Sequence, residues 1–252
     1  MFGLITGSGF YDIADLQDRR VDQVDTPFGP APVTTGSWRG RPLAFVPRHG
    51  MDHRVPPANI NYRANIWALR SVGVQSVLAT AVSGGINPSM GLGSLVLISD
   101  VLNFTSGRAD TFFDGQNEPF DPAAHHVDMT HPYSPELRGH LRRAAESEGI
   151  HVVDGGVYCA TNGPRFETPA EIEMMRRAGG DLVGMTGYPE VVLAVEAGLH
   201  YASIGVISNP AAGLGDEELS VNDILSMLDD VTEPLHRLID RTITLATESA
   251  GS

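Results

Sequence analysis

The sequence predicts an α/β fold: one domain over residues 1–252, in which a central mixed β-sheet is flanked by helices. Short apolar runs rich in β-branched residues recur between glycines, which is typical of buried strands. Segments with helical apolar spacing separate several of these runs, and this alternation favours an α/β architecture. No internal repeat, low-complexity tract or Ser/Pro-rich linker divides the 252 residues, so a single domain is expected.

The expected strands are the apolar runs themselves. In chain order they cover Gly3 to Thr6, Leu43 to Val46, Ser76 to Val82, Leu95 to Val101, His151 to Val157, Asp181 to Thr186 and Tyr201 to Ile207. Each is short and bounded by turn-forming residues, as sheet strands are.

The first expected helices lie between these strands. The segment from Asn59 to Val72 has a broad apolar face at helical spacing. Thr168-Pro169-Ala170-Glu171 combines an N-cap threonine, a proline in the first helical position and the glutamate of a capping box. This signal predicts a helix that begins after Thr168 and ends near Gly179-Gly180.

Two further helices are expected in the last quarter of the chain. Pro189-Glu190 begins one of them, with Gly198 as its C-terminal cap. Ser220 caps the other, whose apolar residues follow helical spacing until Pro234 kinks or restarts the helix.

The segment from Asn103 to Pro135 differs from its surroundings. It is rich in Gly, Asp, Pro and aromatic residues and carries no clear periodicity. It is therefore interpreted as a long loop, and loops of this length within a compact domain are often functional.

Composition excludes several function classes. The chain has 17 Lys+Arg against 31 Asp+Glu, a formal charge of −14, which repels nucleic acid and anionic membrane surfaces. The single cysteine, Cys159, allows neither an internal disulfide nor a multi-cysteine metal site. The first residues have no basic region and no long apolar run, so a cytoplasmic protein without a signal peptide or membrane span is expected.

Two motifs near the N-terminus carry anion-binding chemistry. Thr6-Gly7-Ser8-Gly9 follows the first strand, and its backbone amides and hydroxyl suit an anion, although its spacing alone favours a plain tight turn. Arg48-His49 follows the second strand and adds a guanidinium fork, with a charged surface loop as the alternative. His49 and His53 are four residues apart, but glycine and prolines disfavour a helix and a third ligand is missing, so no metal is expected.

Further candidates lie near the ends of later strands. Ser83 lacks a G-x-S-x-G surrounding and is no hydrolase nucleophile, while Phe166-Glu167 offers an aromatic face beside a carboxylate. Met185-Thr186 and Asn209-Pro210-Ala211 each follow a strand. Because open α/β sheets bind ligands at strand C-termini, these segments together predict one convergent polar site.

In order along the chain, these residues resemble the trimeric purine nucleoside phosphorylases, most closely their methylthioadenosine phosphorylase-like branch. The matching segments are Gly7-Ser8-Gly9, Asp25-Thr26-Pro27-Phe28-Gly29, Arg48-His49-Gly50, Asn61-Tyr62-Arg63-Ala64-Asn65, Gly163-Pro164-Arg165-Phe166-Glu167-Thr168, Met185-Thr186, Pro189-Glu190 and Asn209-Pro210-Ala211-Ala212-Gly213. The resemblance implies phosphorolysis of a purine nucleoside to free base and pentose 1-phosphate, with phosphate as co-substrate and no cofactor.

The resemblance also implies roles for individual residues. Its phosphate site falls on Ser8, Arg48, His49, the backbone around Ala81 and Val82, and Thr186. Met185 corresponds to the residue beneath the sugar and Phe166 to the wall that stacks on the base. His126 matches a position that the family supplies across a subunit boundary to the sugar's 5′ end, which implies a homotrimer.

The base-recognition positions depart from the adenine-specific branch. Asn209 and Ala211 stand where that branch has two aspartates, and Glu167 stands where many adenine enzymes have a small hydroxyl residue. Glutamate can accept from a protonated N1 and asparagine can donate to O6 or N7, so hypoxanthine or guanine is the expected base.

Val221 stands where enzymes that take a free 5′-hydroxyl often carry histidine. An apolar residue there favours a methylthio group, although Val221 could equally be a core residue. The expected substrates are methylthioinosine, inosine and guanosine. The alternatives are a methylthioadenosine phosphorylase that releases adenine, a hydrolytic nucleosidase and a nucleoside-binding protein without activity.

Overall fold

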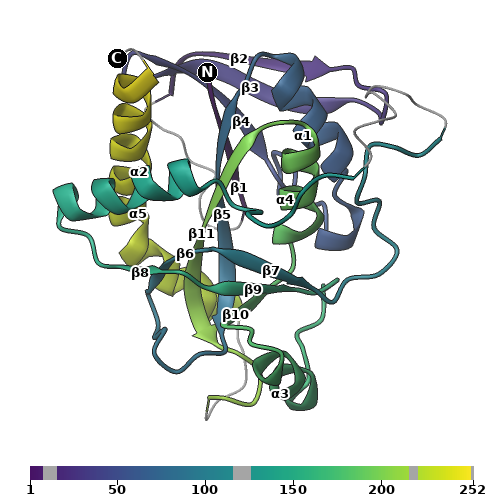
Figure 1. The fold of residues 1–252 in the computed structure, drawn as a ribbon, viewed down its shortest axis with the longest axis vertical. Coiled ribbons are helices and arrows are strands. Elements are labelled where there is room, and N and C mark those ends of the chain that lie inside the picture. The colour runs from purple at the N-terminus through teal and green to yellow at the C-terminus, as the bar shows by residue number, and fades with distance from the viewer. Residues whose placement is uncertain (8–15, 116–125, 216–220, 251–252) are drawn as a thin grey trace.

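A computed structural model describes residues 1–7, 16–115, 126–215 and 221–250, with residues 221–226 and 250 described in backbone only. The described chain forms a mixed β-sheet with helices packed on both faces (Figure 1). The fold class predicted from the sequence is therefore confirmed.

The N-terminal strands form one side of the sheet. They are β1 (Phe2–Thr6), β2 (Leu16–Val24), β3 (Ala31–Trp38) and β4 (Arg41–Pro47). Strands β2, β3 and β4 form an antiparallel meander, and β4 then pairs in parallel with β1. Leu4 and Ile5 of β1 are fully buried because helices cover both faces of this part of the sheet.

The remaining strands surround β5 and β11. Their bounds are β5 (Ser76–Gly85), β6 (Leu95–Leu97), β7 (Asp100–Asn103), β8 (Val152–Asp154), β9 (Val157–Ala160), β10 (Leu182–Gly184) and β11 (His200–Pro210). Strand β5 is parallel to β1 and β11, whereas β10 is antiparallel to β5. The residues after β10 therefore return along β5 toward the carboxyl ends of β1 and β4.

The helices cover the two faces in pairs (Figure 1). Their bounds are η1 (Pro57–Asn59), α1 (Tyr62–Ser71), α2 (Pro135–Glu148), α3 (Pro169–Arg177), α4 (Gly187–Glu196) and α5 (Val221–Ala250). Side chains of α1 and α4 join one buried apolar cluster with the sheet, and side chains of α2 and α5 join another on the opposite face. The carboxyl ends of β1, β4, β5 and β11 meet at one edge of the sheet between these layers.

The helix signals in the sequence are confirmed where they can be checked. Thr168 caps α3, with both hydrogen bonds of the capping box to Glu171 formed. In α4 the residue Tyr188 is not helical, so the regular helix starts at Pro189 as predicted. Ser220 lies outside the described residues, and α5 continues through Pro234 instead of restarting there.

Several strand predictions need correction. The run from Leu95 to Val101 is two strands, since the chain leaves β6 at Ile98-Ser99 and joins a different neighbour as β7. The run from His151 to Val157 is likewise split at Gly155-Gly156. The β2–β3 hairpin was not predicted, because β2 has largely exposed, charged residues and lacks an apolar run.

In the described part of the chain, no helix is long and apolar enough to cross a membrane.

Candidate active site

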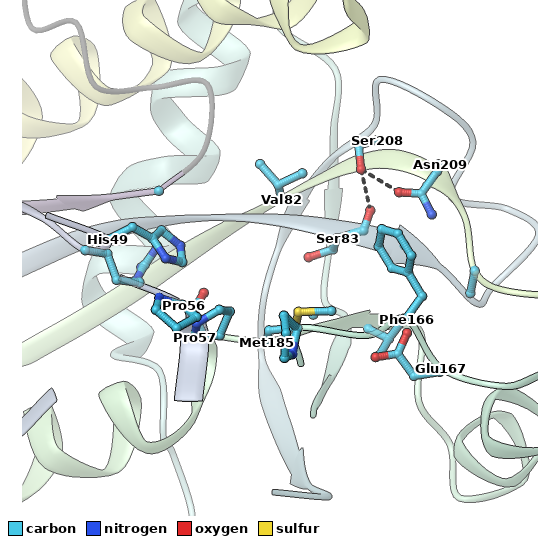
Figure 2. A pocket seen from close by; sticks show the side chains of 18 of the residues that line it. His49, Pro56, Pro57, Val82, Ser83, Phe166, Glu167, Met185, Ser208 and Asn209 are labelled. Atoms are coloured by element: carbon cyan, nitrogen blue, oxygen red, sulfur yellow. Dashed lines mark hydrogen bonds between the residues drawn. The ribbon is translucent and has the colours of Figure 1, made fainter. Parts of the chain in front are cut away.

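A cavity of about 630 Å³ opens at the sheet edge where these strands end. It is lined by Gly7, Arg48, His49, His53, Arg54, Val55, Pro56, Pro57, Val82, Ser83, Gly84, Pro164, Phe166, Glu167, Val183, Gly184, Met185, Thr186, Ser208, Asn209, Ala211 and Ala212. Figure 2 shows His49 on one side, Met185 in the middle, and Phe166, Glu167 and Asn209 on the other side. The convergent site predicted from separate strand ends is thus formed by the fold.

The His49 end of the cavity is a small cradle in which the guanidinium of Arg48 supplies the side-chain donors. Gly7 follows β1, and Arg48 and His49 follow the neighbouring parallel strand β4. A Cβ atom on Gly7 would lie 3.1 Å from Nη1 of Arg48 and 3.4 Å from Nε2 of His49. Glycine therefore leaves open a space beside both groups in which a small oxyanion fits.

A buried carboxylate fixes the orientation of Arg48. Glu190 in α4 accepts from Nε of Arg48 at 2.7 Å and from Nη2 at 2.8 Å, and both side chains are only 1% exposed. Tyr201 of β11 donates to the same carboxylate at 2.7 Å, and Nη1 of Arg48 donates to the Thr80 carbonyl at 2.9 Å. Three of the five guanidinium N–H groups are used in this way, which leaves one on each Nη for a ligand.

This pairing also determines the charge of the cradle. Burial opposes the charged form of Arg48, but the carboxylate of Glu190 outweighs it and raises the pKa of Arg48 above its ordinary value. Arg48 therefore stays charged, while Glu190 neutralises it locally. The cradle offers directed N–H groups without a large net positive field.

His49 has a defined tautomer. Its Nδ1 lies 2.8 Å from the carbonyl oxygen of Val55, and because a carbonyl can only accept, Nδ1 carries the proton. Burial is the main cause that lowers the pKa of His49 to about 4, and the charge of Arg48 acts in the same direction. The neutral ring stacks on His53, with centroids 5.0 Å apart, and leaves Nε2 toward Gly7.

The middle of the cavity is formed by β5 and the residues that follow β10. Val82, Ser83, Met185 and Thr186 all line it. The amide of Thr186 is held by a hydrogen bond of 3.2 Å to the hydroxyl of the buried Tyr158. The Thr186 hydroxyl makes no capping bond to α4.

The far end of the cavity carries a carboxylate and an amide, each held by a neighbouring hydroxyl. Thr161 donates to Oε1 of Glu167 at 2.6 Å, and Ser208 donates to Oδ1 of Asn209 at 2.7 Å. Nδ2 of Asn209 donates to the Pro210 carbonyl at 2.8 Å. The ring of Phe166 lies beside both groups in Figure 2 and is 38% exposed, so it can cover a planar ligand.

The structure brings most of the predicted residues together, with a few exceptions. Ser8 and the side chain of Val221 lie outside the described residues. Ala81 is buried and is not among the residues that line the cavity, and its carbonyl accepts from the hydroxyl of Ser83. His126 is exposed and is not a lining residue of this cavity.

Four residues with a clear place in the site were not assigned to it from the sequence. Glu190 was interpreted only as a helix start, although an acidic residue directly before the apolar run of residues 191–195 signals a buried charge that needs a partner. Thr161, Ser208 and Tyr201 carried no sequence signal, since their roles depend on the side-chain hydrogen bonds that form only in the folded chain. Strand β5 itself stays paired with β11 through Gly84 and Gly85.

Among the described residues, no group of three His, Cys, Asp or Glu side chains is arranged to hold a metal ion. His49 and His53 face one another as stacked rings, an arrangement that does not aim two nitrogens at one ion.

The fold and the cavity first define a class: an α/β protein whose site at the strand ends suits a small oxyanion beside a planar polar ligand. Comparison with known proteins is more specific. The model of the phosphorylase superfamily matches residues 1–244. The chain belongs to this superfamily and is an enzyme, which confirms the resemblance seen in the sequence.

Individual relatives cover nearly the whole chain. A probable 6-oxopurine nucleoside phosphorylase of Moorella thermoacetica is 47% identical, over 95% of this chain and 91% of the relative. A probable S-methyl-5′-thioinosine phosphorylase of Methanothermobacter thermautotrophicus is 43% identical, over 96% and 83%. The solved methylthioadenosine phosphorylase of Schistosoma mansoni with adenine is 30% identical, covers 98% of this chain and 92% of its own, and has a TM-score of 0.89.

Proposed function

We propose that this enzyme catalyses the phosphorolysis of purine nucleosides and prefers 6-oxopurine bases. It would release hypoxanthine or guanine and form ribose 1-phosphate or methylthioribose 1-phosphate. The observation that carries the proposal is the pair Glu167 and Asn209 at one end of a cavity whose other end holds Arg48 and His49. The names of relatives at 43–47% identity support the same reaction.

In the proposed reaction a phosphate oxygen attacks the anomeric carbon of the sugar. The new C–O bond forms as the bond from that carbon to N9 of the purine breaks, and the electron pair of the broken bond moves onto the base. The phosphate would be held in line with the bond that breaks by Arg48, Thr186 and the backbone amide of Gly7. This replaces a bimolecular encounter by an oriented one. Met185 would pack beneath the sugar.

Discrimination between bases would rest on hydrogen-bond direction. A 6-oxopurine presents an N1–H donor and an O6 acceptor, which match the carboxylate of Glu167 and the amide nitrogen of Asn209. Negative charge that develops on the departing base is stabilised by the same amide donor. Adenine has a lone pair at N1 and a donor, the 6-amino group, in place of O6. The carboxylate of Glu167 would then face the N1 lone pair, and mismatches of this kind discriminate strongly between substrates.

The direct test measures base release from inosine, guanosine, methylthioinosine, adenosine and methylthioadenosine, each with and without phosphate. We expect phosphate-dependent release of hypoxanthine and guanine faster than of adenine. Faster adenine release would favour the alternative, a methylthioadenosine phosphorylase, which the solved neighbour from Schistosoma mansoni makes a specific rival. Turnover without phosphate would instead indicate a nucleosidase.

A single substitution tests the base assignment. Asn209→Asp replaces the donor by an acceptor and should shift the ratio of kcat/KM values toward adenosine. Asn59→Asp, the same charge change on an exposed residue, is the control and should leave the ratio unchanged. An unaltered ratio in Asn209→Asp would remove Asn209 from base recognition.

The 5′ group and the assembly belong to the same proposal. We propose that Val221 provides an apolar pocket for the 5′ group, which favours methylthioinosine. We also propose that the enzyme is a homotrimer in which His126 of one subunit completes the site of another. Because His126 is exposed and away from its own cavity, His126→Ala should lower kcat/KM only if the site is shared. Sedimentation of the wild-type enzyme as a monomer, or an unchanged rate in His126→Ala, would refute the shared site. The cytoplasmic location expected from the sequence remains a prediction.

A further inference from the structure

The end of β11 contains a local irregularity that places two polar residues on one side. Ile207 pairs with Ser83 and Asn209 pairs with the next residue, Gly84, so Ser208 is an extra residue in the register. Adjacent residues of a regular strand point to opposite faces, whereas a bulge re-aims one of them. As a result both Ser208 and Asn209 line the cavity.

The two side chains are bonded to one another. The hydroxyl of Ser208 lies 2.7 Å from Oδ1 of Asn209 and 3.4 Å from the carbonyl of Ser83, as the dashed lines in Figure 2 show. A hydroxyl has a single proton to donate, and the shorter contact is the stronger hydrogen bond. Ser208 is only 6% exposed, so water does not compete freely for this bond.

The partners of Asn209 determine which end of its amide is oxygen and which is nitrogen. The Pro210 carbonyl lies 2.8 Å from one end, and a carbonyl can only accept, so that end is the NH₂ group. The other end is therefore the oxygen, and its partner is the Ser208 hydroxyl. One N–H of Asn209 remains after these bonds, and Ser208 occupies one of the two lone pairs of Oδ1.

We propose that Ser208 is a positioning residue that sets base specificity: by bonding Oδ1 of Asn209 it holds the amide so that the NH₂ group, and not the oxygen, is presented to the purine. The proposal rests on the proposed function, because it assigns Ser208 the task of selecting the 6-oxo group over the 6-amino group. Without the hydroxyl, the amide gains freedom to turn its oxygen toward the base. That orientation repels O6 and accepts from a 6-amino group.

The carboxylate of Glu167, the other polar group of the proposed base subsite, is also held by a neighbouring hydroxyl. Thr161 donates to the carboxylate of Glu167 at 2.6 Å, so a hydroxyl fixes this group just as the hydroxyl of Ser208 fixes the amide of Asn209. Ser208 differs in that its partner is an amide with two chemically opposite ends. Loss of Ser208 therefore changes which base is preferred, whereas loss of an ordinary packing contact changes both rates together.

The test compares kcat/KM for inosine and adenosine in Ser208→Ala, Ser208→Thr and wild type. Removing one hydrogen bond should lower the inosine-to-adenosine ratio by roughly three- to tenfold in Ser208→Ala, and Ser208→Thr, which keeps the hydroxyl, should restore it. Ser83→Ala is the matched control: this hydroxyl lines the same cavity but donates to Ala81, so both rates should change by one common factor. Calorimetric binding of hypoxanthine and adenine provides the same ratio independently of turnover.

A double-mutant cycle separates the positioning role from a structural one. In an Asn209→Ala background, Ser208→Ala should leave the ratio unchanged, because the group through which Ser208 acts is absent. An equal effect in both backgrounds, or an equal loss on both nucleosides, would overturn the proposal. If wild type releases no hypoxanthine from inosine with phosphate, the proposed function itself fails, and the wild-type assay alone shows this.

Discussion

Replacing Glu190 by glutamine removes one negative charge from a fully buried pair and leaves the side-chain volume almost unchanged. In the wild type the carboxylate accepts from two nitrogens of Arg48 and from the hydroxyl of Tyr201. A glutamine keeps one oxygen acceptor but turns an NH₂ group toward a guanidinium that has only donors. Arg48 then remains charged, 3% exposed and without its counter-ion.

The magnitude follows from this burial. Breaking a buried pair from one side costs about 3 kcal/mol or more of unfolding free energy, because the remaining charge is uncompensated. For a chain of this length each 1 kcal/mol lowers Tm by roughly 2–4 °C, so Glu190→Gln should lower it by about 6–12 °C. Glu173→Gln is the matched control, since Glu173 also accepts from two arginines but is 39% exposed. Solvent screens that pair, and its Tm should stay within about 2 °C of wild type.

The assay is thermal unfolding of both variants and wild type, with and without phosphate. In the proposed site, bound phosphate would share Arg48 with Glu190, so removing the carboxylate would remove a repulsive neighbour and let the anion compensate the unpaired charge. Phosphate should therefore raise the Tm of Glu190→Gln by more than it raises that of wild type. A Tm of Glu190→Gln within 2 °C of wild type, or an equal phosphate effect in both, would refute the reasoning.

Three further predictions concern the two ends of the cavity. Gly7→Ala puts a Cβ atom 3.1 Å from Nη1 of Arg48. Because this atom narrows the cradle, steady-state kinetics should show that the KM for phosphate rises by about fivefold or more while the KM for inosine stays nearly constant. An unchanged KM for phosphate would show that Gly7 is not part of the cradle. The folded state keeps His49 neutral to a pKa of about 4, whereas the unfolded state protonates it near 6.5, so the unfolding free energy should fall as pH drops between these values. Denaturant titrations of wild type and His49→Gln should differ most across that window, and parallel curves would contradict the assigned burial. Thr161→Val removes the hydrogen bond to the carboxylate of Glu167 and should lower kcat/KM for inosine by roughly three- to tenfold. The KM for phosphate, measured in the same assay, should stay unchanged.

The sequence was sufficient for those parts of the fold that depend on local chemistry. The apolar runs beginning at Gly3, Leu43 and Ser76 became β1, β4 and β5, because strands buried on both faces need no alternation. The capping box at Thr168 was formed with both of its hydrogen bonds. The positions of the strand ends could be predicted from the sequence. For this reason it could also be predicted that Arg48, Glu167 and Asn209 lie in one site.

Features that depend on partners distant in sequence could not be predicted in this way. Arg48 and Glu190 are separated by 142 residues, and no local pattern says which carboxylate a buried arginine meets. The change of neighbour between β6 and β7 also depends on which strands lie beside them. The extra residue at Ser208 is visible only once β11 is paired with β5, since neither strand shows it alone.

The two ends of the cavity are built from segments that do not overlap. Gly7, Arg48 and His49 come from β1 and β4, whereas Phe166, Glu167 and Asn209 come from the β9–α3 connection and the end of β11. A change in one group therefore leaves the backbone of the other in place. In the proposed reaction, substitutions in the base subsite could therefore change the preferred leaving group without rebuilding the subsite for phosphate.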